Sequence, residues 1–429
     1  MRSMFLLAAA LSVSLSALAQ AADWPQWRGP NRDAKSTEKG LLEKWPADGP
    51  KLLWSITEPE MIGTGYGDAS IVGDRVYILG GTTAKKDSKQ FVTCLNVKDG
   101  KKIWQQNIES KQAGYSDGWG GGPRGTPTVQ DGLLFVLGPT GDLVCLDAKD
   151  GKVQWSKNFV TDFGGGIPSW GYSESVLVDG ENVICTPGGK GGMMALEKKT
   201  GKTVWTCKEL TDGAGYSSIV IADIGGVKQY VQQTMKSGVG VRAKDGKLLW
   251  QVGDIKRATA VIPTPVVQDG YVFYTSGYGA GCECFKLEKD GEDGTKATKI
   301  YSNKTLQNHH GGVLAIGDYV YGHSDSGGWM CFPFKTGEDP AWKNNGVGKG
   351  SVIAAEGYLY CYSESSGTLA RVKATEKAYE ESGKFTIPEK SKLRPGSGKV
   401  WAHPVISNGK LYVRDYEKLF VYDLQNPAS

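Results

Sequence analysis

The sequence lacks several features that define common classes of protein. It has no Gly-X-Y period, although 60 of its 429 residues are Gly, and no heptad pattern, which excludes collagen and coiled coil. It also lacks a block or stripe of basic residues, and 50 Lys and Arg against 46 Asp and Glu leave a net charge of only +4. We therefore expect no nucleic-acid partner. Hydrophobic residues at 39% and aromatic residues at 10% exclude intrinsic disorder.

Long apolar runs are absent outside the start of the chain. There, a basic Arg2 precedes the Ala- and Leu-rich run from Met4 to Leu18, and residues 17–19 and 19–21 both offer a small-x-small cleavage pattern. We predict a signal peptide over residues 1–21 and a mature chain that is periplasmic or secreted. No other run approaches the ~20 residues that span a membrane, so no membrane span is expected. No Cys lies near the cleavage sites, so we expect no lipoprotein anchor.

The eight cysteines do not form a disulfide pattern. Cys94, Cys145 and Cys331 each lie six residues before a turn Gly, at one position of a repeat. Equivalent positions of different repeats are normally farther apart than the ~4.4–6.8 Å between Cα atoms that a bridge needs. We predict buried free thiols. Cys282 and Cys284 lack a second pair of ligands, so no metal site is expected.

An internal repeat dominates the sequence. The segment that ends in Asp-Gly-Lys-Lys-Ile-Trp104 returns as Asp-Gly-Lys-Val-Gln-Trp155 and Thr-Gly-Lys-Thr-Val-Trp205. A second motif, in phase with the first, pairs two apolar runs about Asp-Gly, Gly-Asp, Glu-Gly or Asn-Gly, as in a tight β-hairpin. Two hairpins in each unit of 41–51 residues predict the four strands of a propeller blade. The repeated aromatic residues are expected to pack between blades: Trp54, Trp104, Trp155, Trp205, Trp250, Tyr301 and Trp342.

Counting the hairpins predicts an all-β protein, an eight-bladed β-propeller of four-stranded antiparallel blades. Eight copies of the first hairpin precede only seven outer strands, and residues 51–56 supply the missing outer strand ahead of every hairpin. We predict that this N-terminal strand completes the last blade and closes the ring. The predicted organisation is a signal peptide (1–21), an N-terminal strap (22–50) and the propeller (51–426), which allows 47 residues per blade.

The segments that enter the innermost strands are expected to surround the mouth of the central channel. Such concave mouths with polar and aromatic side chains are typical of binding sites. The candidates, in blade order, are Tyr66, Asp68, Trp119, Arg124, Thr126, Trp170, Tyr172, Glu174, Tyr216, Ser217, Arg257, Thr259, His309, His310, Lys349, Ser351, Trp401 and His403. Gly residues around them permit tight turns or a close approach to a ligand.

The Leu-Asp-x-x-Asp/Thr-Gly-Lys-x-x-Trp repeat resembles the PQQ-type propeller repeat. Quinoprotein alcohol dehydrogenases and the propeller subunit of the outer-membrane β-barrel assembly machinery share that repeat. The segments Trp24–Arg32, Gly122–Thr128, Trp170–Glu174 and Thr186–Lys190 are similar to a secreted branch often described as polyvinyl-alcohol-dehydrogenase-like. The resemblance covers essentially the whole mature chain and implies the fold more strongly than an activity, because one propeller fold hosts both enzymes and scaffolds.

The resemblance also implies where PQQ, a flat quinone with three carboxylates, and its Ca²⁺ would bind. Asp68 and Glu174 would be the catalytic carboxylates, as base or as Ca²⁺ ligand. The residues expected to bind the cofactor are Trp119, Arg124, Thr126, Trp170, Tyr172, Arg257, His309, His310, Lys349, Trp401 and His403. Against this reading, the adjacent Cys-Cys pair of many such enzymes and a Cys-x-x-Cys-His haem motif are both missing.

Three functional hypotheses follow. The first is an exported binding or scaffold module that needs no cofactor and holds a peptide, glycan or protein at the channel mouth. The second is a PQQ- and Ca²⁺-dependent alcohol dehydrogenase that passes electrons to an external acceptor. The third is a polysaccharide-degrading enzyme that uses His309, His310, Tyr172 and Arg124, for which the sequence offers residue types but no motif.

Overall fold

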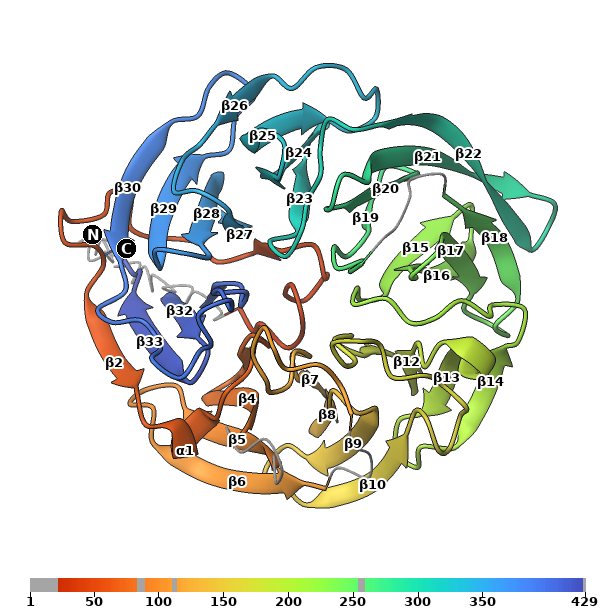
Figure 1. The fold of residues 1–429 in the computed structure, drawn as a ribbon, viewed down its shortest axis with the longest axis horizontal. Helices are drawn as coiled ribbons and strands as arrows, with labels where there is room; N and C mark the ends of the chain where they lie inside the picture. The colour runs from red at the N-terminus through yellow and green to blue at the C-terminus, as the bar shows by residue number, and fades with distance from the viewer. Residues whose placement is uncertain (1–21, 83–88, 110–113, 254–258, 427–429) are drawn as a thin grey trace, which may run out of the picture.

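The computed structural model of the chain describes residues 22–82, 89–109, 114–253 and 259–426. These residues form eight blades arranged in a ring, as the repeat predicts (Figure 1). The predicted signal peptide lies outside the described residues. Within the described ranges, no helix combines the length and the apolar character required to cross a membrane.

Each blade is an antiparallel sheet whose strands follow one another from the inside of the ring to the outside. Blades one and two contain β3 (Ser70–Val72), β4 (Arg75–Gly81), β5 (Gln90–Asn96), β6 (Lys102–Ile108), β7 (Thr128–Gln130), β8 (Leu133–Leu137), β9 (Asp142–Asp147) and β10 (Val153–Asn158). Blades three and four contain β11 (Leu177–Asp179), β12 (Asn182–Cys185), β13 (Met193–Glu197), β14 (Thr203–Cys207), β15 (Val220–Ile224), β16 (Val227–Gln233), β17 (Gly238–Arg242) and β18 (Leu248–Val252).

The second half of the ring repeats this order. Blades five and six contain β19 (Val266–Gln268), β20 (Tyr271–Ser276), β21 (Gly281–Asp290), β22 (Gly294–Asn303), β23 (Val313–Ile316), β24 (Tyr319–Ser324), β25 (Gly328–Pro333) and β26 (Trp342–Asn344). Blades seven and eight contain β27 (Gly350–Ala355), β28 (Tyr358–Ser363), β29 (Thr368–Lys373), β30 (Glu381–Thr386), β31 (Val405–Ser407), β32 (Lys410–Asp415) and β33 (Lys418–Asp423). Two short helices, α1 (Pro59–Ile62) and the 3-10 turn η1 (Gly189–Gly191), lie in connections.

The ring is closed by a strand from the start of the chain, which confirms the prediction. Strand β2 (Leu52–Ile56) pairs antiparallel with β33, with Trp54 opposite Val421 and Ile56 opposite Leu419. It thereby becomes the outer strand of blade eight. Without β2, β33 would present an unpaired edge.

The repeated Trp side chains join neighbouring blades through the repeated turn glycines. The ring of Trp155 in blade two lies under Gly201 of blade three, and its Nε1 donates to the Lys198 carbonyl at 2.8 Å. A Cβ atom at Gly201 would stand 2.8 Å from that ring, and its φ of +68° is also strained for any other residue. The Trp ring of the preceding blade therefore leaves no room for a side chain at the turn Gly of the motif.

Two aromatic positions show how far this rule extends. Tyr301 takes the place of Trp in blade five: its ring lies against Gly337 and its hydroxyl donates to the Phe334 carbonyl at 2.6 Å. Trp250 also lies in a buried cluster with Val272 and Phe285 of the next blade, but its Nε1 donates to the Gln229 side chain of its own blade rather than to a carbonyl of the next one. The reason is the length of the next hairpin: β21 and β22 each have ten residues. Their turn is therefore too far along the hairpin to bring a Gly against the ring of Trp250.

All eight cysteines are free and buried, as predicted. Burial raises the pKa of the Cys94 and Cys145 thiols to about 12. These thiols therefore remain protonated at neutral pH and behave as small apolar side chains.

Residues 22–45 cross the centre of the ring before β2 begins (Figure 1, red segment). Trp24 forms a bridge with Ile71 of blade one, β1 (Lys35–Ser36) pairs in parallel with β27 of blade seven, and Trp45 packs on Phe385 at 5.3 Å. Between these contacts, the fully buried Arg28 and Arg32 donate to carbonyls of blades six and three. This segment ties together inner strands that are far apart in the ring.

Candidate functional site

A cavity of about 360 Å³ lies at the end of the channel where the chain enters the inner strands. Connections to all eight inner strands contribute to its wall, together with two hairpin loops and the segment before β2. Its lining residues are Trp27, Tyr66, Trp119, Arg124, Trp170, Ser173, Ser175, Tyr216, Ser218, Ala260, Ile262, Tyr278, His309, His310, Lys349, Glu364, Ser397, Lys399, Trp401 and His403. We refer to it as the mouth cavity.

Most of the cofactor-binding candidates meet in the mouth cavity. The residues that line it are Trp119, Arg124, Trp170, His309, His310, Lys349, Trp401 and His403. Thr126 and Tyr172 are buried elsewhere. Arg257 lies outside the described residues, so its position is not compared.

Thr126 and Tyr172 make bonds that hold the blades together. The Asp68 amide donates to the Thr126 hydroxyl at 2.9 Å, and the Thr126 amide donates to the Ser175 hydroxyl at 2.8 Å. These bonds connect the inner segments of blades one, two and three. The Tyr172 hydroxyl donates to the Pro187 carbonyl at 2.9 Å within blade three.

The two carboxylates considered as catalytic groups, Asp68 and Glu174, are fully buried and do not line the mouth cavity. Asp68 accepts the His403 amide at 2.7 Å, and Glu174 accepts the Thr186 amide at 2.9 Å. Burial raises the pKa of each to about 8, against the lowering effect of these bonds and of Arg28 or Arg32 nearby. Their surroundings favour a structural role beside the buried arginines.

A stack of rings forms one wall of the mouth cavity. His310 lies parallel to Trp401, with ring centroids 4.2 Å apart, and contacts His309 at 3.7 Å. Lys349 bridges His309 and Asp325, with 2.7 Å from its Nζ to each partner atom. Burial lowers the pKa of His309 to about 4 and of His403 to about 3, and it lowers the pKa of His310 well below its usual value. At neutral pH all three imidazoles are uncharged.

The mouth cavity also contains residues that the sequence did not single out as site candidates. Tyr278 and Glu364 lie in the loops that join the second and third strands of blades five and seven, which open at the same end of the channel. The sequence could have predicted these two residues. In an antiparallel blade, the loop between the second and third strands lies at the same end as the connection that enters the first strand. Trp27 closes the floor: its Nε1 donates to the Thr264 hydroxyl at 2.9 Å and its ring lies 4.7 Å from that of His403.

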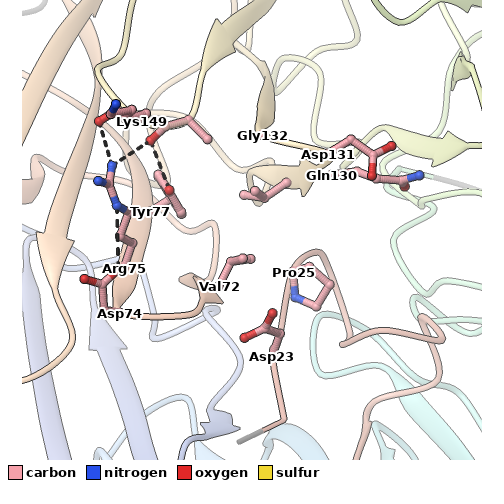
Figure 2. Close-up of a pocket in the computed structure, with 12 residues that line it drawn as sticks. Asp23, Pro25, Val72, Asp74, Arg75, Tyr77, Gln130, Asp131, Gly132 and Lys149 are labelled. Atoms are coloured by element: carbon pink, nitrogen blue, oxygen red, sulfur yellow. Dashed lines mark hydrogen bonds and ion pairs between the residues drawn. The ribbon is translucent and has the colours of Figure 1, made fainter.

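A second, more open groove of about 490 Å³ lies between the hairpin turns of blades one and two, at the other end of the channel (Figure 2). Figure 2 shows Arg75 turned toward Lys149 of blade two. Its guanidinium donates to the carbonyls of Ala148 and Lys149. The Tyr77 hydroxyl donates to the same Ala148 carbonyl at 3.0 Å. Because these groups already hold the two blades together, the mouth cavity is the stronger candidate site.

The mouth cavity supplies only part of what PQQ with Ca²⁺ requires. Trp119, Trp170 and Trp401 offer aromatic faces, and Arg124 and Lys349 offer positive charge. Ca²⁺ needs several oxygen ligands, and Glu364 is the one carboxylate among the lining residues, with Trp401 Nε1 donating to it at 3.2 Å. Among the described residues, no three His, Cys, Asp or Glu side chains are grouped to hold a metal. The residues present do not fit the metal-bound cofactor.

The fold and the site together define a class: an eight-bladed β-propeller with an aromatic cavity, of the size of a small ligand, at one end of its channel. The model of the family described as outer membrane protein assembly factor BamB, a family of PQQ-like propellers, matches residues 88–344. The chain belongs to this family.

Individual relatives agree with this assignment. Outer membrane protein assembly factor BamB of Escherichia coli is 27% identical over 183 residues, which cover 38% of this chain and 43% of that protein. The Yersinia pestis protein of the same name is 25% identical over 239 residues, 52% of this chain and 55% of the relative. The chain thus spans about half the length of the curated relatives it matches.

Two solved structures share the fold across most of the chain. BamB from Moraxella catarrhalis has a TM-score of 0.60 at 15% identity and covers 87% of this chain and 97% of its own. Quinohemoprotein alcohol dehydrogenase from Comamonas testosteroni has a TM-score of 0.63 at 12% identity. The matched region covers 95% of this chain and 81% of the dehydrogenase chain. At this identity the likeness concerns the fold alone, and it includes both an assembly factor and an enzyme.

Proposed function

We propose that the chain is an exported binding module that holds a protein, peptide or glycan partner at the mouth cavity. The observation that carries the proposal is the convergence of all eight blades on one aromatic cavity that Trp27 closes from below. Concave sites with many apolar groups and a few placed polar groups are the usual form of binding pockets. A partner therefore enters from one side only.

The relatives support a scaffold role in the cell envelope. Their names describe factors for the assembly of outer-membrane proteins. Together with the predicted signal peptide, this favours a location in the periplasm or outside the cell. We extend to this chain the binding role and not a particular complex, because the matched segments cover 38% and 52% of it.

The alternative is a PQQ-dependent alcohol dehydrogenase. The fold shared with a quinohemoprotein dehydrogenase and the aromatic and cationic residues of the mouth cavity favour it. The buried positions of Asp68 and Glu174 count against it, because neither carboxylate lines the cavity where an alcohol would bind.

A thermal melt of the mature chain separates the two functions. Aliquots receive PQQ with Ca²⁺, neutral and acidic saccharides, or short peptides, and parallel samples contain alcohols and an artificial electron acceptor. A ligand at about 100 times its Kd adds about 2.7 kcal/mol of stability. We expect a saccharide or peptide to raise the Tm of the parent chain and, because its binding weakens about tenfold, to stabilise Trp119→Ala by only about half as much. A Ca²⁺-dependent shift with PQQ, accompanied by alcohol-dependent dye reduction, would overturn the proposal in favour of the enzyme.

A further inference from the structure

Several polar atoms in the wall of the mouth cavity have no protein partner. They are His309 Nε2, His310 Nδ1, His403 Nδ1 and Ser173 Oγ, which form no hydrogen bond within the described residues and lie just beneath the cavity surface, so that a small rotation of each side chain is needed to present them to a ligand. A buried polar group without a partner costs about 1–3 kcal/mol. Four such atoms around one cavity indicate a ligand that forms hydrogen bonds.

The neighbouring bonds assign the roles of two of these atoms. The Nδ1 atom of His309 accepts from the Lys349 ammonium at 2.7 Å, so its neutral ring carries the proton on Nε2, which is free to donate. The His403 Nε2 atom lies 3.2 Å from the His310 carbonyl and must donate to it, which leaves Nδ1 free to accept. The cavity therefore offers a donor and an acceptor from uncharged groups, with the Ser173 hydroxyl able to do either.

The charged side chains of the cavity are already engaged. Arg124 donates to the carbonyls of Gly122 and Gly120 at 3.1 and 3.0 Å. Lys349 is paired with Asp325 at 2.7 Å. Glu364 accepts from Trp401 Nε1 at 3.2 Å, and Lys349 and, more weakly, Lys399 lower its pKa against the larger raising effect of burial. An anionic ligand would have to displace these contacts, so the cavity selects for a neutral ligand.

Two aromatic rings of the cavity remain largely open to solvent. Trp119 is 51% exposed and Tyr278 is 48% exposed, which makes them the two most exposed aromatic residues among the described ones. A sugar ring matches this combination, because its C–H face packs on an aromatic ring while its hydroxyls each donate and accept hydrogen bonds. The volume of about 360 Å³ lies in the range of small-ligand pockets, about 300–1,000 Å³, and accommodates the end of a chain of sugars.

We propose that the mouth cavity binds the end of a neutral saccharide. Successive sugar rings lie against Trp119 of blade two and Tyr278 of blade five, and their hydroxyls bond to His309, His403 and Ser173. This inference rests on the proposed binding function and specifies the chemical class of its ligand.

The first test is a glycan array that carries neutral oligosaccharides and oligosaccharides with uronic acids. The array is probed with the mature chain. Calorimetric titration then measures the Kd of the corresponding disaccharides, with a short Trp-containing peptide as a further arm. We expect neutral saccharides to bind at least about tenfold more tightly than their uronate counterparts, a difference of about 1.4 kcal/mol. Equal or tighter binding of uronates overturns the inference, and so does the absence of neutral saccharide binding up to about 10 mM, well above a Kd of about 1 mM.

Three variants locate the binding. Trp119→Ala and Tyr278→Ala remove exposed rings, so the fold is retained and saccharide binding weakens about tenfold or more. Ser173→Ala removes a buried hydroxyl without a protein partner, so the Tm stays the same or rises while binding weakens several-fold. Val204→Ala, on the outer strand β14 at 53% exposure, is the matched control and leaves binding unchanged.

The outcomes separate this inference from the proposed function. Binding of the peptide that is lost in Trp119→Ala, without saccharide binding, overturns the saccharide and keeps the binding module. Saccharide binding that is undiminished in Trp119→Ala, Tyr278→Ala and Ser173→Ala places the ligand elsewhere and overturns both. The absence of any cavity ligand also overturns both.

Discussion

The mouth cavity lies between two layers that are stabilised by different kinds of interaction: the strap end, which is the floor formed by residues 22–45, and the open mouth above it. At the strap end, the buried charges of Arg28 and Arg32 bond to backbone carbonyls of blades six and three, next to Asp68 and Glu174. At the mouth, buried imidazoles are neutral and two aromatic rings are exposed. Buried charge is strongly destabilising when one partner is lost, whereas unpaired neutral groups at a cavity remain available to a ligand. The comparison identifies the strap end as a structural seal and the mouth as the binding end.

The largest effect is expected from opening the ring, which abolishes both ends together. Deletion of residues 51–56 removes β2, leaves β33 with an unpaired edge and removes Trp54 from its place against Gly100. We expect a large loss in the free energy of unfolding and a tendency to aggregate. Chemical denaturation and light scattering measure the two effects. A truncated chain that melts like the parent would show that the ring does not depend on this strand.

The next largest effect is expected at the strap end. Arg32→Ala leaves the buried carbonyls of Ser175 and Val176 without their donor, and each unsatisfied acceptor costs about 1–3 kcal/mol, so we expect a loss of about 3–5 kcal/mol. Lys152→Ala is the control, because this exposed cation pairs with Asp150 at the surface of blade two, and its loss should leave the free energy of unfolding nearly unchanged. Urea denaturation of both variants gives the comparison. Equal losses would remove the distinction between a buried seal and an ordinary surface pair.

The two ends should respond to pH in opposite directions. The mouth imidazoles have a pKa of about 6.5 in the unfolded chain and a lower pKa in the folded chain. The stability that they contribute is therefore complete above about pH 6.5 and is lost as the pH falls toward 4. Asp68 and Glu174 keep their protons up to about pH 8 in the folded chain, so the stability they contribute below about pH 4 is lost as the pH rises through 8. Stability should therefore be highest near pH 6.5.

Denaturation midpoints between pH 4 and pH 9 test this dependence. Each differential proton changes the stability by about 1.4 kcal/mol per pH unit. Glu174→Gln should flatten the decline between about pH 6.5 and pH 8, and His403→Asn should reduce the decline on the acid side. A decline above pH 6.5 that is as steep in Glu174→Gln as in the parent would exclude this carboxyl as its cause.

The smallest effect on stability is expected at the mouth. Trp119→Ala removes a ring that is 51% exposed, so the free energy of unfolding should change by about 0.5 kcal/mol or less. Trp155→Ala, between blades two and three, is the matched comparison and should cost about 3–5 kcal/mol. Thermal melts of the two variants show whether a mouth Trp and a blade Trp differ in this way. Similar losses would mean that Trp119 belongs to the core.

The sequence predicted the fold well because its signals are local and repeated. A turn Gly and an outer-strand Trp recur with a period of one blade, and the structure explains both by one contact, such as that of Trp155 with Gly201. The surplus of one outer strand in residues 51–56 likewise identified the closure. Trp250 shows the limit, because the longer hairpin of the next blade places no turn Gly against its ring, and its Nε1 bonds to Gln229 of its own blade instead.

The site was predicted less completely. The order of strands placed the connections to the inner strands at the mouth, and residues such as His310 and Trp401 do line it. The connections are irregular, so a simple alternation of side chains does not hold there: Tyr66 faces the cavity, whereas Asp68 turns toward the His403 amide. Tyr278, Glu364 and Trp27 were missed because they lie outside those connections.

The sequence alone determined the number of blades, the strand that closes the ring and the burial of the free cysteines, because each follows from the position of a residue within a repeat. Only the tertiary structure decided which residues of the connections face the mouth cavity, that Asp68 and Glu174 lie beside buried arginines, and that the histidines are neutral. The physical reason is that exposure and pKa depend on all the groups packed around a side chain. Around the channel, those groups come from eight blades and a strap that are distant from one another in the chain.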